Sequence, residues 1–218
     1  MFDFRNVLSL SPIYILFRRL VGGGGGTKRI IEEFVRPQAG ERLLDIGCGP
    51  GNLLEYLHDL DVEYVGFDLS RKYIDSARKR FGRRGRFICE RVSETSLSGL
   101  GKFDVVTAIG LLHHLDDEEA LQLFRLAHTA LKEGGRFVTF DGCFTKSQSR
   151  LARQFLHWDR GKHVRTCNQY VHLVEKVFGS VSVEIRHDLI NIPYTHLIMQ
   201  CNSRASSAPQ GKPANRVA

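Results

Sequence analysis

A short apolar run followed by three closely spaced glycines constrains the fold of this chain more than any other stretch. Residues 43–46 suit a buried strand, and residues 52–60 place leucines at helical spacing. Between them Gly47, Gly49 and Gly51 permit a tight turn in which the backbone can approach a ligand. A strand, a glycine turn and a helix in this order are typical of a nucleotide-binding corner, although isolated glycine clusters also mark ordinary turns.

The rest of the chain alternates between strand-like and helix-like segments. Strands are expected at residues 42–46, 63–67, 86–90, 103–109, 136–141, 181–185 and 196–201. Helices are expected at residues 27–35, 52–60, 70–81 and 146–158, from a capping box at Asp116 and Glu119 to Gly134 and Gly135, and from Asn168 to Gly179. No helix fits between the last two strands. The sequence therefore predicts an α/β fold with a mainly parallel seven-stranded sheet and an antiparallel pair at its edge.

The chain divides into three expected parts. Residues 1–26 form an apolar segment and a glycine run, read as an N-terminal cap and a flexible linker. Residues 27–201 form the main domain, in which residues 146–166 add a helix and a basic loop. Residues 202–218 are rich in Ser, Ala, Pro and basic residues, and we expect them to be disordered. A membrane-surface helix within residues 1–21 is an alternative to the cap.

The cysteines and the net charge indicate the expected compartment and limit the kinds of ligand and partner. The five cysteines are widely spaced and form no Cys-x-x-Cys pair, which favours reduced thiols in a cytoplasmic protein and argues against a zinc site. The formal net charge is +7. Lys and Arg occur along the whole chain rather than in one block, so the charge permits an acidic partner without implying one.

One acidic residue follows the second expected strand. Asp68 lies about 20 residues past the glycines, where a carboxylate can accept hydrogen bonds from ribose hydroxyls; a helix cap is the competing role, for which Ser70 is better placed. A nicotinamide cofactor would require a third glycine at the position of Asn52. The spacing instead favours a nucleoside with a smaller appendage.

Four motifs in this order resemble those of class I S-adenosylmethionine-dependent methyltransferases over roughly residues 27–201. They are residues 43–52, 66–70, 103–115 and 131–138. The resemblance implies a Rossmann-like, doubly wound sheet of seven strands with a reversed last strand. It also implies S-adenosyl-L-methionine as the cofactor.

The resemblance assigns cofactor-binding positions. Asp45, Gly47, Cys48 and Gly49 border the methionine and ribose parts, Asp68 takes the ribose hydroxyls, Leu69 packs on adenine, and Ile109, Gly110 and His113 line the sulfonium side. The family usually carries an acidic residue after the third strand for the adenine amino group. Here the matching residue is Arg91, next to Glu90, so either Glu90 replaces that acid or backbone groups suffice.

Methyl transfer from a sulfonium requires alignment and exclusion of water, and a base only when the acceptor must lose a proton early. The candidate bases are His113, His114 and His163, and Asp141 could orient an acceptor or cap the next segment. The basic loop that holds Arg160, Lys162, His163 and Arg165 could bind a carboxylate or phosphate, or could simply be solvated.

The acceptor is predicted to be a small molecule, with an acidic or glycosylated compound as one option, methylated on O or N. Motifs of base-amine methylation and nucleic-acid modules are missing, which argues against a nucleic-acid partner. Three alternatives remain open: an RNA or protein methyltransferase, a non-catalytic partner protein that keeps the fold, and a membrane-associated scaffold. Arg91 is the feature that best supports the non-catalytic partner.

Overall fold

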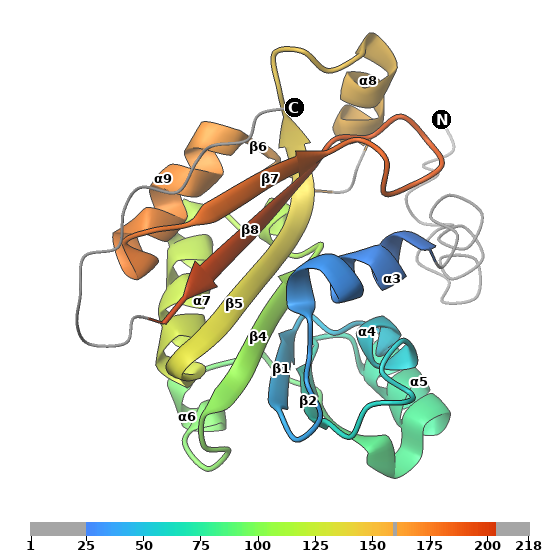
Figure 1. Cartoon of the computed structure of the whole chain (residues 1–218), viewed down its shortest axis with the longest axis vertical. Helices are drawn as coiled ribbons and strands as arrows, with labels where there is room; N and C mark the ends of the chain where they lie inside the picture. The colour runs from blue at the N-terminus through green and yellow to red at the C-terminus, as the bar shows by residue number, and fades with distance from the viewer. Residues whose placement is uncertain (1–24, 159–160, 204–218) are drawn as a thin grey trace.

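A computed structural model describes residues 25–158 and 161–203 of the 218-residue chain. The expected cap at residues 1–21, Arg160 and most of the expected tail lie outside these described residues. The described part is one α/β unit built on a twisted sheet (Figure 1). The strands are β1 (Arg42–Ile46), β2 (Glu63–Phe67), β3 (Gly85–Ile88), β4 (Phe103–Ile109), β5 (Leu131–Phe144), β6 (Arg165–Thr166), β7 (Ser182–Arg186) and β8 (His196–Asn202).

Strand order within the sheet is β3-β2-β1-β4-β5-β8-β7, and the short β6 pairs with β5 outside this path. All neighbours from β3 to β5 are parallel, whereas β8 runs antiparallel to both β5 and β7. The order reverses between β1 and β4, so the carboxyl ends of these two strands border the crevice of a doubly wound sheet. The predicted mostly parallel, Rossmann-like sheet with a reversed last strand is confirmed.

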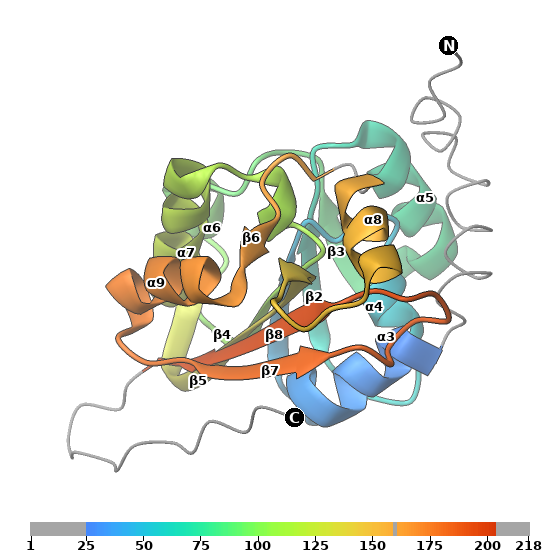
Figure 2. The ribbon, with the colours of Figure 1, turned by 90° about the horizontal axis from the view of Figure 1, so that it is seen from above.

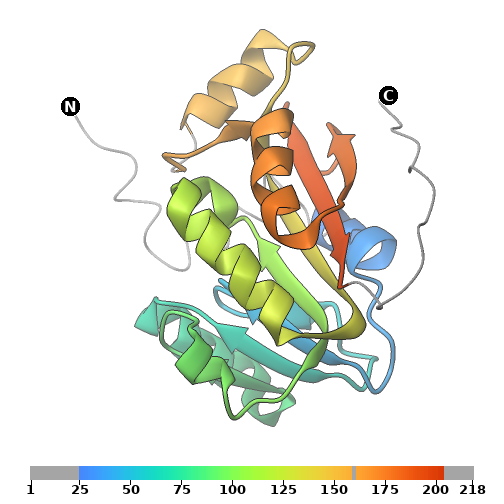
Figure 3. The ribbon, with the colours of Figure 1, turned by 90° about the vertical axis from the view of Figure 1, so that its left-hand side faces the viewer.

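Helices cover both faces of the sheet. They are α3 (Gly25–Ile30), α4 (Asn52–Glu55), α5 (Arg71–Phe81), α6 (Glu94–Leu97), α7 (Asp117–Ala130), α8 (Arg150–Trp158) and α9 (Cys167–Phe178), with a π-helical turn η1 (Ile31–Val35) and two 3₁₀ turns, η2 (Gly82–Arg84) and η3 (Leu112–His114). Figure 3 shows α7 and α9 on one face and α3 on the other. In the view from above, α8 lies in front of the strand ends (Figure 2).

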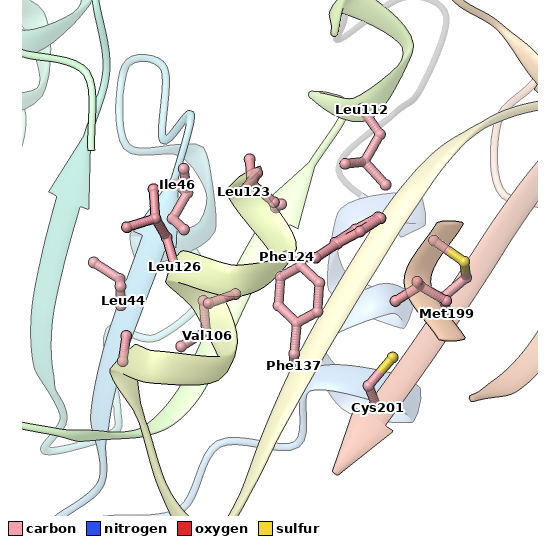
Figure 4. Packing of buried hydrophobic residues seen from close by; sticks show 14 of the residues in the cluster. Leu44, Ile46, Val106, Leu112, Leu123, Phe124, Leu126, Phe137, Met199 and Cys201 are labelled. Atoms are coloured by element: carbon pink, nitrogen blue, oxygen red, sulfur yellow. The ribbon is translucent and has the colours of Figure 1, made fainter. Parts of the chain in front are cut away.

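The alternation of side chains along each strand produces two cores. Leu44 and Val106 face the layer of α7 and α9, whereas Leu43 and Val105 face α3, α4 and α5. In the first core Phe124 of α7 meets Phe137 of β5 edge to face, with ring centroids 6.0 Å apart (Figure 4). A fully buried Leu or Phe contributes about 1.5–3 kcal/mol, so two full layers can hold the strand ends in fixed positions.

The N-terminal boundary differs from the prediction. The helix expected from residue 27 begins at Gly25, so the last two glycines of the run are helical rather than linker. Gly26 is buried, and a Cβ atom there would lie 2.0 Å from the carbonyl oxygen of Leu189. The glycine at this position is therefore required for close packing. Arg36, with φ of 45°, ends the helical segment just before Pro37, as the proline predicted.

Other boundaries were predicted wrongly where turns compete with helices. Helix α4 ends at Glu55, not at residue 60, and β3 begins and ends earlier than the predicted 86–90. Helix α7 has the predicted capping box at Asp116 but ends at Ala130, because β5 begins at Leu131 and contains both glycines.

The C-terminal third shows similar differences. Helix α8 begins at Arg150 rather than residue 146, and Thr166, not Asn168, forms the capping box of α9. Asn202 belongs to β8, and the amide of Ser203 donates to the carbonyl of Gly135, so these two residues are part of the sheet rather than the tail.

Candidate functional site

The glycine turn after β1 forms as the sequence predicted, and each position requires glycine for a different reason. The amides of Gly47 and Cys48 both donate to the carbonyl of Phe67, at 2.8 and 2.9 Å, which joins the turn to the end of β2. Gly49 has φ of 56°, and no atom lies within 4 Å of where its Cβ would stand. Gly51 has φ of 78° and a Cβ there would meet Phe81 at 2.8 Å. Gly49 thus faces open space, whereas Gly51 allows α4 and α5 to approach.

Asp68 links the turn to the next helix. Its Oδ2 accepts from the amide of Gly49 at 2.9 Å, and its Oδ1 accepts from the amide of Ser70 at 2.7 Å. Ser70 caps α5 through its hydroxyl, as predicted, so Asp68 does not serve as that cap. Asp68 is half-buried, and the neighbouring Leu69 is 65% exposed. The Asp68 carboxylate, held by two backbone amides, and the exposed Leu69 beside it form a surface that suits a sugar with hydroxyl groups and a flat nucleobase.

Asp45 supports this turn from within the sheet. It is 3% exposed, its Oδ2 accepts from the Tyr64 hydroxyl at 2.7 Å, and its Oδ1 accepts from the Thr107 hydroxyl at 2.8 Å. Burial raises the pKa of Asp45 to about 6, against the lowering effect of these two hydrogen bonds. Burial also raises the pKa of the Cys48 thiol well above its usual range. A direct ligand contact by Asp45 or Cys48 stays a prediction.

The residues after β3 do not form a buried acidic site. Glu90 and Arg91 are both exposed, and Nη1 of Arg91 lies 3.1 Å from Oε1 of Glu119 on α7. Arg91 is thus paired with an acid of another element. The expected adenine contacts of Glu90 and Arg91 stay predictions.

The segment after β4 brings a histidine to a buried carboxylate. Gly110 has φ of 66° and starts a turn that carries His113 back over β5. Nδ1 of His113 lies 2.7 Å from Oδ1 of Asp141, and the His113 amide donates to the same oxygen at 3.2 Å. Burial raises the pKa of Asp141, while the His113 hydrogen bond opposes the rise. Asp141 is 2% exposed, and its predicted role toward an acceptor stays a prediction.

Asp141 and His113 form one buried unit. Within the described residues, Oδ2 of Asp141 has no hydrogen-bond partner, which makes the charge of the carboxylate depend on His113. Ile109, the last residue of β4, is half-buried beside this unit, and Gly110 is exposed. The predicted grouping of Ile109, Gly110 and His113 at one strand end is present, and their contacts with a ligand stay predictions.

The basic loop closes over His113. The His163 amide donates to the His113 carbonyl at 2.9 Å, and a Cβ at Gly161 would lie 2.2 Å from Cδ2 of His113. Only glycine can therefore occupy position 161 without displacing the ring. The structure brings His163 next to His113 as part of one backbone unit, and a basic role for the His163 side chain stays a prediction.

Arg165 has neither of the two roles predicted for the basic loop, which were binding an anionic ligand and exposure to solvent. It is 6% exposed, and its guanidinium donates to the carbonyls of Leu112, Leu115 and His163 at 2.7–3.1 Å. It also forms a salt bridge with Asp117 at the start of α7. Neither a ligand contact nor a solvated loop describes this side chain, because its donors are occupied inside the protein. Arg165 instead ties the basic loop to the turn that carries His113.

This arrangement predicts a large difference between the two partners of one salt bridge. Arg165→Met should lower the free energy of unfolding by about 3 kcal/mol, because three buried or partly buried carbonyls lose their donor. Asp117→Asn should cost about 1 kcal/mol or less, because Asp117 is 72% exposed and can be solvated. Urea unfolding of both variants measures this, and equal losses would contradict the assigned role of Arg165.

Comparison with known proteins agrees with this geometry. Residues 44–137 match a family model described as a methyltransferase domain. The fold resembles that of phosphoethanolamine N-methyltransferase 2 from Haemonchus contortus, solved in complex with S-adenosyl-L-methionine, with a TM-score of 0.68 at 16% identity over 94% of this chain and 61% of that one. Residues 44–137 thus resemble the methyltransferase domain of class I S-adenosylmethionine-dependent enzymes.

Curated relatives match about half of the chain. A ubiquinone biosynthesis O-methyltransferase from Ruegeria pomeroyi is 38% identical over 117 residues, which are 50% of this chain and 46% of that protein. A probable fatty acid methyltransferase from Mycobacterium tuberculosis is 28% identical over 124 residues, 56% of this chain and 29% of that protein. The chain thus spans less than half the length of these relatives.

The residues that hold the candidate site in place from inside the protein were not predicted from the sequence. Tyr64 and Thr107 hold Asp45, Gly161 makes room for His113, and Arg165 anchors the turn. Tyr64 and Thr107 stand on strands whose alternation could have placed them on the face of Asp45. For Gly161 and Arg165 the sequence carries no such signal, because their partners around η3 are more than 40 residues away.

Among the described residues, no group of three or more His, Cys, Asp or Glu side chains could hold a metal ion. Nor does any helix in the described part of the chain have the length and apolar character needed to cross a membrane. All five cysteines are described, and none is in a disulfide.

Proposed function

We propose that this protein is an S-adenosylmethionine-dependent methyltransferase that methylates an oxygen or nitrogen of a small molecule. The observation that carries the proposal is Asp68, whose two oxygens are held by the amides of Gly49 and Ser70 at the mouth of the glycine turn. Both amides bind the inner side of the carboxylate. Its outer lone pairs are directed to where a ribose diol would lie.

The residues present fit the proposed cofactor. Open space in front of Gly49 leaves room for the ligand beside the turn, and the exposed Leu69 offers an apolar surface to adenine. Gly110 similarly leaves the end of β4 clear, since the nearest atom to a Cβ there would be Cε1 of His113 at 3.9 Å. When bound, S-adenosylmethionine supplies an electrophilic methyl group on a sulfonium that leaves as a neutral thioether.

The buried pair at the ends of β4 and β5 supplies the proposed base. A hydrogen bond from Nδ1 of His113 to Asp141 fixes the tautomer in which Nε2 carries the lone pair. Asp141 also stabilises the imidazolium that forms when Nε2 takes a proton from an acceptor hydroxyl or ammonium group. Asp141 therefore acts as a positioning residue for His113 and does not itself touch the acceptor.

The acceptor class rests on this pair and on the relatives. The named relatives include an O-methyltransferase of ubiquinone biosynthesis and a probable fatty acid methyltransferase, and the solved structure is of a phosphoethanolamine N-methyltransferase. These names share small acceptors and differ in the atom that is methylated. A base at the end of β4 suits a hydroxyl or a protonated amine, since both must lose a proton.

Two measurements test the proposal. Calorimetric titration with S-adenosylmethionine and S-adenosylhomocysteine should show one site per chain. Transfer of a radiolabelled methyl group should then be assayed with panels of phenols, carboxylic acids and amines, and in parallel with RNA and protein. Binding with transfer to a small acceptor supports the proposal. No binding, or transfer only to RNA or protein, would overturn it, and binding without any transfer would favour the non-catalytic partner.

A further inference from the structure

The excess positive charge of the chain is concentrated in one short stretch. Residues 71–86 contain eight Lys or Arg and one Asp, a net charge of +7, which equals the formal net charge of the whole chain. The other 202 residues are therefore balanced. The expectation that basic residues are distributed without a block was wrong in this respect, because eight of them fall within these 16 residues.

This stretch forms α5, the turn η2 and the edge strand β3. Three of its arginines are tied to backbone carbonyls: Arg78 to Phe87, Arg80 to Pro50 and Arg84 to Leu57. Within the described part of the chain, the other five have no side-chain hydrogen bond or ion pair; they are Arg71, Lys72, Lys79, Arg83 and Arg86. Crowding unpaired cations in this way is unfavourable in the free protein, and a bound anion would relieve it.

A cleft at this edge can receive such an anion. It has a volume of about 370 Å³, within the range of small-molecule sites, and Arg42, Arg83, Arg84 and Arg86 all line it. Glu63 also lines the cleft, but both its oxygens are bound by the Arg42 guanidinium at 2.7 Å. The unpaired Arg83 and Arg86 therefore remain as the groups that can bind a ligand.

The cleft lies at the opposite end of the strands from the methyltransferase crevice. Glu63 and Gly85 are the first residues of β2 and β3, whereas Asp68 follows the last residue of β2. A five-residue strand separates the two places by about 15 Å. A ligand in the cleft would thus leave the crevice accessible.

The shape of the basic region selects the kind of ligand. Arg86 pairs in register with Val65, which faces the α7 core, whereas α5 covers the other face of the sheet. Arg86 thus lies on one face of the edge strand, and Arg83 and Arg84 follow α5 on the other, so a flat membrane could not contact these cations together. Guanidinium groups bind phosphate oxygens through paired hydrogen bonds. We propose that the cleft at the amino ends of β2 and β3 binds a small phosphate-rich anion, a di- or triphosphate.

Inorganic triphosphate is the probe, titrated into the full chain at an ionic strength of about 0.15 M. The variant R83Q/R86Q should weaken binding about tenfold or more, because two charge-assisted contacts are lost. The control variant R125Q/K176Q removes the same charge from exposed positions on α7 and α9 and should bind within about twofold of the wild type. Melting temperatures verify that both variants fold.

Several results would overturn the proposal. They are no measurable binding to the wild type, equal losses in both double variants, which would indicate attraction by net charge alone, and displacement of triphosphate by S-adenosylhomocysteine, which would place it in the crevice. Simultaneous binding of both ligands, with a loss confined to R83Q/R86Q, supports it. This outcome does not depend on whether methyl transfer is observed.

Discussion

Asp68→Ala is expected to lower the affinity for S-adenosylhomocysteine by about 100-fold or more. A hydrogen bond to a charged group contributes about 1.5–3 kcal/mol, and the carboxylate is proposed to accept two from the ribose. The substitution also releases the amide of Gly49, which Asp68 holds at 2.9 Å. Both effects act on the same ligand, so the loss should appear in calorimetric titration as weaker binding without a change in stoichiometry.

Two controls separate ligand binding from folding. Asp68→Asn keeps the shape and one acceptor oxygen, so its loss should be smaller than that of Asp68→Ala. Asp75→Asn removes an exposed carboxylate from the helix that follows Asp68 and should leave the affinity unchanged. Melting temperatures should stay close to that of the wild type. A decrease in affinity of less than about threefold for Asp68→Ala would place the ribose elsewhere.

Asp141→Asn is expected to reduce kcat by about 100-fold or more with an acceptor that the panel identifies. The amide oxygen of Asn can still accept from the His113 backbone amide. Because Nδ1 of His113 contacts the same oxygen, it can also still donate there, but a neutral amide no longer stabilises the imidazolium that forms when Nε2 takes a proton. The affinity for S-adenosylhomocysteine should change by less than about threefold, since Asp141 is buried away from the glycine turn.

The pH profile distinguishes a positioning role from loss of structure. Without the carboxylate the imidazolium is less stable, so the acidic limb of the kcat profile should move to lower pH while its plateau falls. A variant that is merely unstable would lower the plateau and leave the limb in place. His113→Gln should abolish the limb. Retention of wild-type kcat by His113→Gln would contradict the assignment of the base.

Local sequence signals predicted the glycine turn and the helix caps around the site well. Gly47, Gly49 and Gly51 all have positive φ, Ser70 caps α5, and Asp116 opens α7. Each of these features is encoded within a few residues, because turns and caps depend on nearby backbone groups. The mostly parallel sheet with an antiparallel last pair could also be predicted, since short alternating segments leave few topologies.

The buried surroundings of Asp141 and Arg165 could not be predicted, because they depend on packing between segments that are distant in the sequence. Asp141 lies within β5, and the turn after Gly110 carries His113 across it and buries it. Arg165 stands in a loop that reads as polar and basic, yet the carbonyls around His113 enclose its guanidinium. Nothing in the sequence near either residue indicates these partners.

The position of β8 between β5 and β7 has a consequence for how this protein is made. Paired residues of β5 and β8 are separated by 54 to 66 positions along the chain, so β5 must wait for a distant partner during synthesis. Such late pairing slows folding and leaves a 14-residue strand with an open edge for a time. Chains that stall before residue 196 would present that edge to one another, so the β5 edge should be the part most prone to aggregation in the cell.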